Sequence, residues 1–197
     1  MAQTPVLTTA RLTLRPFRLG DASRFVGLAG DLAVARMTSD IPHPLYIWQC
    51  RRWLRQARGE VRFAVEHQGD LIGGVGYFCH RTRVGELGFW LGQDYWGKGF
   101  ATEASRAVVT YAFTTGHLDA LTSANFIDNP ASARILTKLG FTANGRMRTQ
   151  SIARGHEIDC TTWRLEREAA QVIYRLPQPS AASAGGWMRL FARISGR

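Results

Sequence analysis

The segment that most constrains the fold covers residues 86–103, where an apolar stretch leads into a glycine-rich turn and then into an amphipathic stretch. The pattern predicts a buried strand, a tight turn with glycines at 97 and 99, and a helix. Glycine lets the backbone approach a ligand closely, and N–H groups at a helix N-terminus favour anions. Because Lys98 adds a positive charge, we expect the turn to hold a pyrophosphate.

Two better-known phosphate motifs do not describe this turn. The P-loop pattern G-x-x-x-x-G-K-[ST] is absent from the sequence. A dinucleotide fingerprint, G-x-G-x-x-G, would need a third glycine where Thr102 stands, and the strands before it predict a meander instead of a βαβ unit. The alternative, a tight loop with no ligand, is disfavoured because the turn lies between an apolar strand and a helix.

The rest of the chain predicts strands and helices around this segment. We expect strands over residues 6–17, 62–66, 70–79, 84–91, 121–126, 141–151 and 158–167. We expect helices that start at Asp21 and Asp31, and others over residues 47–58, 102–115 and 129–140, the last with Asn129 as its N-cap. The 197 residues therefore predict one mixed α/β domain that ends near Arg175.

The last residues differ from this domain in composition. Residues 177–186 (PQPSAASAGG) predict a flexible linker. An apolar stripe beside arginines predicts a short basic amphipathic helix in residues 187–197. We therefore divide the chain into a domain (1–176), a linker (177–186) and a basic tail (187–197). The tail is expected to pack on the domain or stay disordered; the alternatives are docking on a second subunit or on an anionic membrane surface.

Charge is the unusual part of the composition. The chain has 25 Lys+Arg against 15 Asp+Glu, a net charge of +10. Only Lys98 and Lys138 are lysines, so 23 of these 25 cations are arginines. A basic surface favours phosphate-bearing cofactors, nucleic acid, acidic lipid or acidic protein, without choosing among them. Codon usage is an equally good explanation of the arginine bias.

The cysteines and the N-terminus bear on location. Cys50, Cys79 and Cys160 are isolated, so the sequence shows no zinc-ligand cluster and we expect no metal. Scattered cysteines are typical of a reducing compartment. The chain begins without a signal-peptide pattern, and no apolar run approaches the roughly 20 residues that span a bilayer. We therefore expect a cytoplasmic protein without a transmembrane segment.

Four blocks of sequence carry a resemblance to a known family. They are residues 7–15 followed by 21–22, residues 86–90, residues 95–104, and residues 129–132 continuing to 138–141. In this order and spacing the chain resembles the GNAT superfamily of acetyl-CoA-dependent N-acetyltransferases, and within it the RimJ/RimL-type branch of ribosomal-protein N-terminal acetyltransferases. The resemblance implies a single α/β (α+β) domain. Its mixed, mostly antiparallel central sheet would have about six to seven strands, flanking helices and splayed central strands.

The resemblance also implies a site for the donor, acetyl-CoA. The family's phosphate motif, Q/R-x-x-G-x-G/A, maps onto residues 96–101, with Trp96 in place of Gln or Arg. Backbone N–H groups of residues 97–102 would hold the pyrophosphate. The strand edge at residues 89–91, beside a bulge, would pair with the pantetheine arm. The residues expected to bind the donor are Phe89, Trp90, Leu91, Trp96, Gly97, Lys98, Gly99, Phe100, Ala101, Thr102, Asn129, Ser132 and Arg134, with Arg106 as a further cation near the phosphates.

Acetyl transfer requires that the amine lose a proton, that the thioester carbonyl be polarised and that the thiolate be stabilised. Glu86 is the first candidate base, because the resemblance implies a catalytic carboxylate on this central strand, where partial burial would raise its pKa. Asp159 is the second candidate. The remaining options are water-mediated deprotonation and binding of an amine that is already neutral. N–H groups near Leu91 suit the carbonyl, and Ser132 suits the departing sulfur. Each candidate has a structural alternative. Glu86 could be a carboxylate that pairs with an arginine, and Ser132 could be an ordinary residue in the first turn of a helix.

The acceptor amine is expected to enter from the side opposite the donor. The loop between the second and third helices matches the family's acceptor-lining region, which gives Ser39, Asp40, Ile41 and Tyr46, with Trp90 on the pocket floor. The branch favours a protein or peptide N-terminus, and the superfamily adds polyamines, amino acids and antibiotics. The other classes are a catalytically silent CoA-binding regulatory module and a nucleic-acid or ribosome binder. A homodimer is a further assembly to test.

Overall fold

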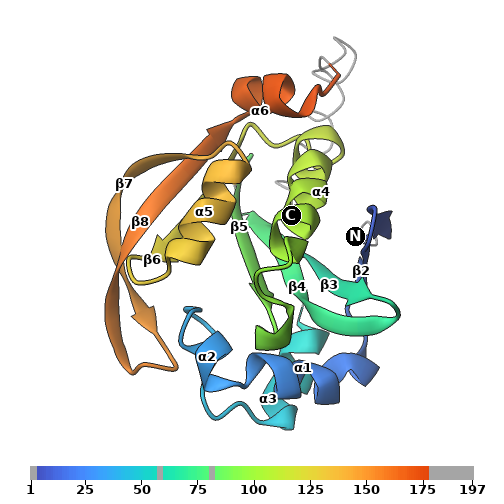
Figure 1. The fold of residues 1–197 in the computed structure, drawn as a ribbon, viewed down its shortest axis with the longest axis vertical. Coiled ribbons are helices and arrows are strands. Elements are labelled where there is room, and N and C mark those ends of the chain that lie inside the picture. Colours follow the sequence, from blue (N-terminus) through green and yellow to red (C-terminus); the bar gives the residue numbers. More distant parts are fainter. Residues whose placement is uncertain (1–3, 57–59, 80–82, 178–197) are drawn as a thin grey trace, which may run out of the picture.

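The computed structural model describes residues 4–56, 60–79 and 83–177, which fold around one mixed sheet (Figure 1). In these residues the sheet has eight strands in the order β1-β2-β3-β4-β5-β6-β8-β7. Neighbours are antiparallel except β5 and β6, which are parallel. This confirms the predicted α/β class and the mostly antiparallel sheet. The strands are β1 (Leu7–Thr8), β2 (Thr13–Pro16), β3 (Glu60–His67), β4 (Asp70–Cys79), β5 (Val84–Leu91), β6 (Ala120–Phe126), β7 (Thr142–Ser151) and β8 (His156–Glu166).

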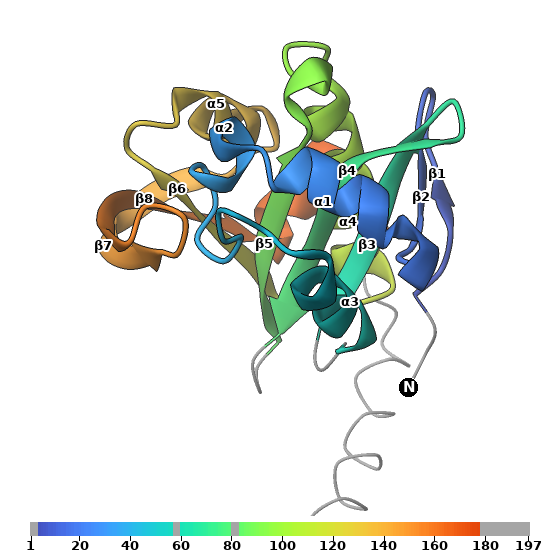
Figure 2. The ribbon, with the colours of Figure 1, turned by 90° about the horizontal axis from the view of Figure 1, so that it is seen from below.

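Helices flank this sheet, as predicted. They are α1 (Ala22–Ala29), α2 (Leu32–Ala35), α3 (Ile47–Arg55), α4 (Phe100–Thr114), α5 (Pro130–Lys138) and α6 (Arg167–Tyr174). Figure 1 shows α4 and α5 side by side, with α1, α2 and α3 grouped away from them. Figure 2 shows α1 crossing the central strands, with α2 and α3 beside it. The helices before β3 and those after β5 therefore cover different parts of the sheet.

Two apolar clusters follow the alternation of side chains along the strands. In the larger one, Leu87 of β5 packs in a group that contains Val108 and Phe113 of α4. In the smaller one, Trp90 of β5 packs against Phe25 of α1, with ring centroids 4.8 Å apart. Since side chains of a strand alternate between faces, Leu87 and Trp90 mark opposite faces of the sheet. We call them the α4 face and the α1 face.

The central strands β5 and β6 pair over only three residues. Their register ends where Glu86 lies opposite Thr122. Beyond this point the hydroxyl of Ser123 donates a hydrogen bond to the carbonyl of Leu87 at 2.9 Å, in place of a ladder bond. The strands therefore diverge, as predicted. The expected bulge is wrong, because β5 keeps an unbroken register with β4.

One expected strand differs from the structure, and the structure contains one helix that the sequence does not predict. Residues 6–17 form the two strands β1 and β2 instead of one, because the N–H of Thr9 donates to the carbonyl of Leu12 and turns the chain. This split gives eight strands instead of six or seven. Helix α6 follows β8, where the sequence predicts no element, and the Tyr174 hydroxyl anchors it to the carbonyl of Leu139 at 2.8 Å. Residues 178–186 of the predicted linker and the tail 187–197 lie outside the described residues.

A buried ion pair joins the first strands to the first helix. The Arg15 guanidinium donates to both carboxylate oxygens of Asp21 at 2.8 Å and to Glu66 of β3 at 2.7 Å. Asp21 precedes α1 as expected, but its side chain bonds no N–H of that helix and accepts instead from the N–H of Arg18. Burial alone would raise the pKa of Asp21, yet these hydrogen bonds hold that pKa below its ordinary value.

We expect Asp21→Asn to lower the free energy of unfolding at pH 7 by about 3 kcal/mol, because it leaves the Arg15 charge buried without its partner. A carboxyl with a lowered pKa in the folded state stabilises above its ordinary pKa, and this contribution is lost as the pH falls through the folded value. The difference in the free energy of unfolding between Asp21→Asn and the unaltered protein should therefore shrink below about pH 4. Urea unfolding at pH 7 and pH 3 measures both effects.

The matched control is Glu157→Gln, because Glu157 forms an exposed ion pair with Arg148 on β7. It should change the free energy of unfolding by no more than about 0.5 kcal/mol. An Asp21→Asn deficit that is the same at both pH values would contradict the assignment.

Candidate functional site

The glycine-rich turn has the backbone geometry expected of a phosphate site. Gly97 and Gly99 have φ angles of +74° and +82°, in the left-handed region that glycine adopts without strain. Gly99 is the residue before α4, a helix of 15 residues. Within the described chain, the backbone N–H groups of residues 97–102 donate no hydrogen bond. A row of free donors at the positive end of a helix can bind an anion.

A clamp from the first strands holds this turn. Arg11 donates to the carboxylate of Glu103 at 2.7 Å and to the carbonyl of Lys98 at 3.1 Å. The hydroxyl of Thr9 donates to the same carboxylate at 2.6 Å. Burial would raise the pKa of Glu103, but these hydrogen bonds hold it below its ordinary value. Arg11 and Glu103 lie in two of the sequence blocks that resemble the family, yet nothing in the sequence shows that they touch.

The cations expected near the phosphates take different positions. Lys98 is exposed, with its Nζ 5.8 Å from the centre of the Tyr95 ring, and Arg134 on α5 is exposed as well. Arg106 instead donates to the carbonyl of Lys138 at 3.2 Å and lies over the ring of Tyr174. Lys98 and Arg134 are therefore available to an anionic ligand, whereas Arg106 links α4 to the end of α5 and to α6.

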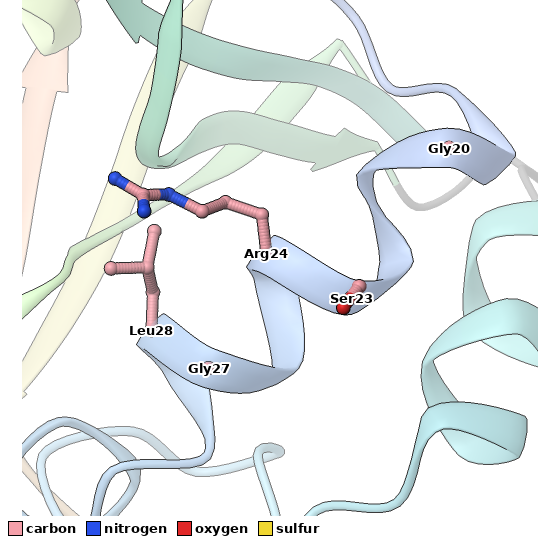
Figure 3. A pocket seen from close by; sticks show the side chains of 5 residues that line it. All are labelled: Gly20, Ser23, Arg24, Gly27 and Leu28. Carbon is pink, nitrogen blue, oxygen red and sulfur yellow. The ribbon is translucent and has the colours of Figure 1, made fainter.

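A hollow of about 460 Å³ runs along α1 and is lined by Gly20, Ser23, Arg24, Gly27 and Leu28 (Figure 3). Figure 3 shows Arg24 and Leu28 on the same side of the helix. Arg24 donates to the hydroxyl of Tyr95 at 2.9 Å and to the carbonyl of Leu71 at 3.1 Å. Arg24 thus ties α1 to the residues before the glycine turn. The hollow contains none of the acceptor residues that the sequence suggests.

The end of β5 presents a backbone edge to the gap beside β6. Backbone groups of an antiparallel strand alternate between its partner strand and the opposite side. The carbonyl of Leu87 points toward β6, where it accepts from Ser123. Phe89 and Leu91 follow at steps of two, so their backbone groups point the same way, past the end of the β5–β6 pairing. The carbonyl of Leu91 accepts from the indole of Trp96 at 2.8 Å, which braces the turn against the strand.

Glu86 and Gly88 project onto the α1 face. Glu86 is exposed, so the expected partial burial of this side chain is wrong. A Cβ placed on Gly88 would meet no atom within 4 Å. The sheet is therefore open beside Glu86. Trp90, the next residue on this face, packs against Phe25 of α1, and its role as the floor of an acceptor pocket stays a prediction.

The structure does not bring Asp159, the second candidate base, close to Glu86. Asp159 is exposed on β8 and forms an ion pair with Arg148 at 3.5 Å. Glu86 pairs with Thr122, which pairs in turn with Arg164, so these three residues share the α1 face. Asp159 lies an odd number of residues from Arg164 and points to the other face.

The start of α5 lies on the other side of the gap. The Asn129 side chain accepts from the N–H of Ser132 at 3.1 Å, which confirms Asn129 as the N-cap. The carbonyl of Asn129 accepts from the side chain of Asn125 of β6 at 3.2 Å. The hydroxyl of Ser132 is half-buried and has no hydrogen bond to a described residue. That hydroxyl is therefore available to a ligand.

The acceptor loop, residues 36–46 between α2 and α3, reaches the turn between β7 and β8. The N–H of Ile152 in that turn donates to the carbonyl of Ser39 at 2.9 Å. Asp40 and Tyr46 are exposed, whereas Ile41 packs into the apolar cluster under α1 and α3. Ser39 and Asp40 therefore lie together beside the β7–β8 turn, and Ile41 serves the core.

Among residues 4–56, 60–79 and 83–177, no group of three or more His, Cys, Asp or Glu side chains is placed to hold a metal ion. No helix in those ranges is long and apolar enough to cross a membrane.

Sequence relatives share an acetyltransferase description. Residues 11–142 match the family described as Acetyltransferase (GNAT) domain. The chain is 31% identical over 163 residues to the uncharacterized N-acetyltransferase p20 of Bacillus licheniformis, covering 78% of this chain and 91% of the relative. It is 29% identical over 168 residues to the uncharacterized N-acetyltransferase YoaA of Bacillus subtilis, covering 81% and 95%. It is 28% identical over 138 residues to spermidine N(1)-acetyltransferase of Escherichia coli K12, covering 68% and 74%.

Solved structures share the fold. The ribosomal L7/L12 alpha-N-protein acetyltransferase RimL, in complex with coenzyme A, superposes with a TM-score of 0.74 at 16% identity, covering 84% of this chain and 99% of that one. Spermidine N-acetyltransferase from Vibrio cholerae, with CoA and spermine, gives 0.70 at 21% identity, covering 82% and 99%. The microcin C7 self-immunity acetyltransferase MccE, with acetyl-CoA and AMP, gives 0.72 at 18% identity, covering 80% and 93%.

We expect Gly97→Ala to raise the dissociation constant for coenzyme A about tenfold or more. The new methyl group would strain a backbone at φ +74° and would project beside the free N–H groups. Isothermal titration calorimetry with coenzyme A measures the effect.

Gly155→Ala is the control, because Gly155 in the β7–β8 turn has φ +73° and, like Gly97, no atom within 4 Å of an added Cβ. Both variants should lose similar stability, and only Gly97→Ala should lose affinity. Equal affinities for the two variants would exclude the turn as the phosphate site.

Proposed function

The chain belongs to the GNAT acetyltransferase family, and we propose that it transfers the acetyl group of acetyl-CoA to the amino group of a protein or peptide N-terminus. Family membership follows from the match over residues 11–142, and it makes the chain an acyltransferase whose donor is acetyl-CoA. The acceptor and the individual site residues are the proposed parts. We also place the protein in the cytoplasm, on the basis of its scattered cysteines.

The donor side of the proposed site consists mainly of backbone groups that point away from the rest of the chain. The N–H groups of residues 97–102 and the ammonium of Lys98 would hold the pyrophosphate. The strand edge at Phe89 and the N–H of Leu91 offer backbone hydrogen bonds to an extended arm. This arrangement suits a long, phosphorylated and flexible donor that enters where β5 and β6 diverge. We assign Arg134 to the outer phosphates.

The reaction needs a proton acceptor on the amine side and stabilisation on the sulfur side. The donor supplies a thioester; the amine forms the new C–N bond as the C–S bond breaks. We assign the amine's proton to Glu86, directly or through a water molecule. The N–H of Leu91 would polarise the carbonyl, and the hydroxyl of Ser132 would donate to the thiolate. The exposure of Glu86 fits a group that must exchange its proton with solvent between turnovers.

The observation that carries the acceptor proposal is the charge of the α1 face. Glu86 on this face and Asp40 in the acceptor loop are exposed carboxylates that form no ion pair in the described chain, whereas Asp128 is paired with Arg154 at 2.7 Å. A polyamine carries several ammonium groups and would be repelled by a chain of net charge +10. One α-amino group needs only one carboxylate. The open space at Gly88 leaves room for the residues behind that amino group.

An acceptor screen with thiol detection tests this proposal. Peptides with the N-terminal sequences of ribosomal proteins should release coenzyme A from acetyl-CoA, and the same peptides blocked by Nα-acetylation should not. Spermidine should give a kcat/KM at least tenfold below that of the best peptide. A higher value for spermidine, an amino acid or an aminoglycoside would make the enzyme a small-molecule acetyltransferase. If the protein binds coenzyme A but no amine causes release of coenzyme A from acetyl-CoA, the protein would be a catalytically silent CoA-binding module.

We expect Glu86→Gln to lower kcat at pH 7 roughly 100-fold, the scale of a lost general base, and to leave the KM for acetyl-CoA within twofold. Asp159→Asn is the comparison, and should change kcat less than threefold because Asp159 lies on the other face. An unchanged pH–rate profile in Glu86→Gln would remove Glu86 from the mechanism.

A further inference from the structure

One arginine outside the expected site binds two loops that flank the gap. Arg154 lies in the turn between β7 and β8, and its side chain is only 12% exposed. Its Nε donates to the carbonyl of Arg36 at 2.7 Å. Its two terminal nitrogens donate to the two carboxylate oxygens of Asp128 at 2.7 and 3.1 Å. One nearly buried guanidinium therefore joins segments that are 118 and 26 residues away in the sequence.

The contacts around Arg154 make its position rigid. The guanidinium lies over the ring of Phe126, the last residue of β6, with its carbon 4.9 Å from the ring centre. A terminal nitrogen also lies 3.6 Å from the sulfur of Met37. A bidentate ion pair with a stacked aromatic fixes a guanidinium in both distance and plane. The pKa of Asp128 is held below its ordinary value, above all by the hydrogen bond from Arg154.

The two segments carry opposite halves of the proposed site. Arg36 and Met37 open the acceptor loop, which continues to Ser39 and Asp40. Asp128 is the residue before Asn129, whose side chain caps the helix that carries Ser132. A shift of Arg154 would move the acceptor loop and the start of α5 relative to each other. The relative position of reacting groups matters strongly, since a misplacement of about 1 Å costs roughly 100-fold in rate.

We propose that Arg154 is a positioning residue that holds the acceptor loop in register with the start of α5, and so aligns the amine with the donor. The inference rests on the proposed acceptor side of the site. A positioning role predicts a different result from a purely structural role. Loss of Arg154 should disturb the alignment of the two substrates and leave donor binding at the distant turn before α4 unchanged.

Arg154→Gln and Arg154→Lys test this role by steady-state kinetics with acetyl-CoA and the best amine of the screen. We expect Arg154→Gln to lower kcat/KM for the amine by about 10- to 100-fold, with the KM for acetyl-CoA within twofold of the unaltered enzyme. Arg154→Lys should recover only part of the loss, because an ammonium cannot bind both Asp128 oxygens in a fixed plane and also reach Arg36. Should Arg154→Gln fail to fold, Arg154→Lys and Asp128→Asn carry the test.

Arg148→Gln is the control, since it removes one arginine from the neighbouring strand β7, where the side chain is 63% exposed. Its kinetic constants should stay within twofold. The proposal is overturned if Arg154→Gln matches Arg148→Gln, or if the KM for acetyl-CoA rises as much as the KM for the amine.

Amide hydrogen exchange separates this inference from the acceptor assignment. In the full-length chain saturated with coenzyme A, Arg154→Gln should speed exchange at Ile152, Met37 and Thr38, whose N–H groups are hydrogen-bonded next to Arg154. Exchange in α4 should stay unchanged. If no amine in the screen is acetylated, the acceptor proposal fails while this measurement still decides the role of Arg154. Unchanged exchange at Ile152 and Met37 would then overturn it.

Discussion

The site depends on the early end of hydrogen bonding between two parallel strands. β5 and β6 pair only as far as Glu86 and Thr122, and Ser123 then satisfies the carbonyl of Leu87 with its hydroxyl. This substitution lets the strands separate without leaving that carbonyl unpaired, which would otherwise cost about 1–3 kcal/mol. The separation leaves the backbone edge at Phe89 without a partner strand in the described chain. A fully paired sheet would offer no such free edge to the proposed donor.

Arginines hold the structure around this opening, and their geometry explains part of the unusual composition. Arg11, Arg15 and Arg154 each donate to a carboxylate and to at least one further group on another segment. A planar guanidinium with five donors can make such bridges, whereas the point charge of a lysine cannot. Exposed arginines such as Arg134 do not bridge two segments in this way, and codon usage explains equally well why they are arginine instead of lysine.

Much of the architecture could be predicted because local patterns agree with the final contacts. The turn at residues 97–99 needs glycine for its φ angles, and Asn129 followed by Pro130 is a start signal that the structure uses directly. The burial of Glu86 could not be predicted, because it depends on what packs beside β5, and nothing fills the space at Gly88. The ion pairs of Arg11 and Arg154 also could not be predicted, because a sequence gives the charge of a side chain but not its distant partner.

The Arg11–Glu103 clamp has a consequence for how the chain acquires its shape. Its partners are 92 residues apart, so a growing chain cannot close it until α4 has emerged from the ribosome. Contacts between such distant residues have a high entropic cost of loop closure, and they form late unless other contacts have already shortened the loop. Pairing of β2 with β3 and β4 with β5 provides that shortening. The glycine-rich turn at residues 97–99 should therefore reach its final conformation last among the parts of this half of the sheet. A chain whose synthesis stops before α4 would already contain the paired strands β3 and β4, but it would lack the turn proposed to bind the anion.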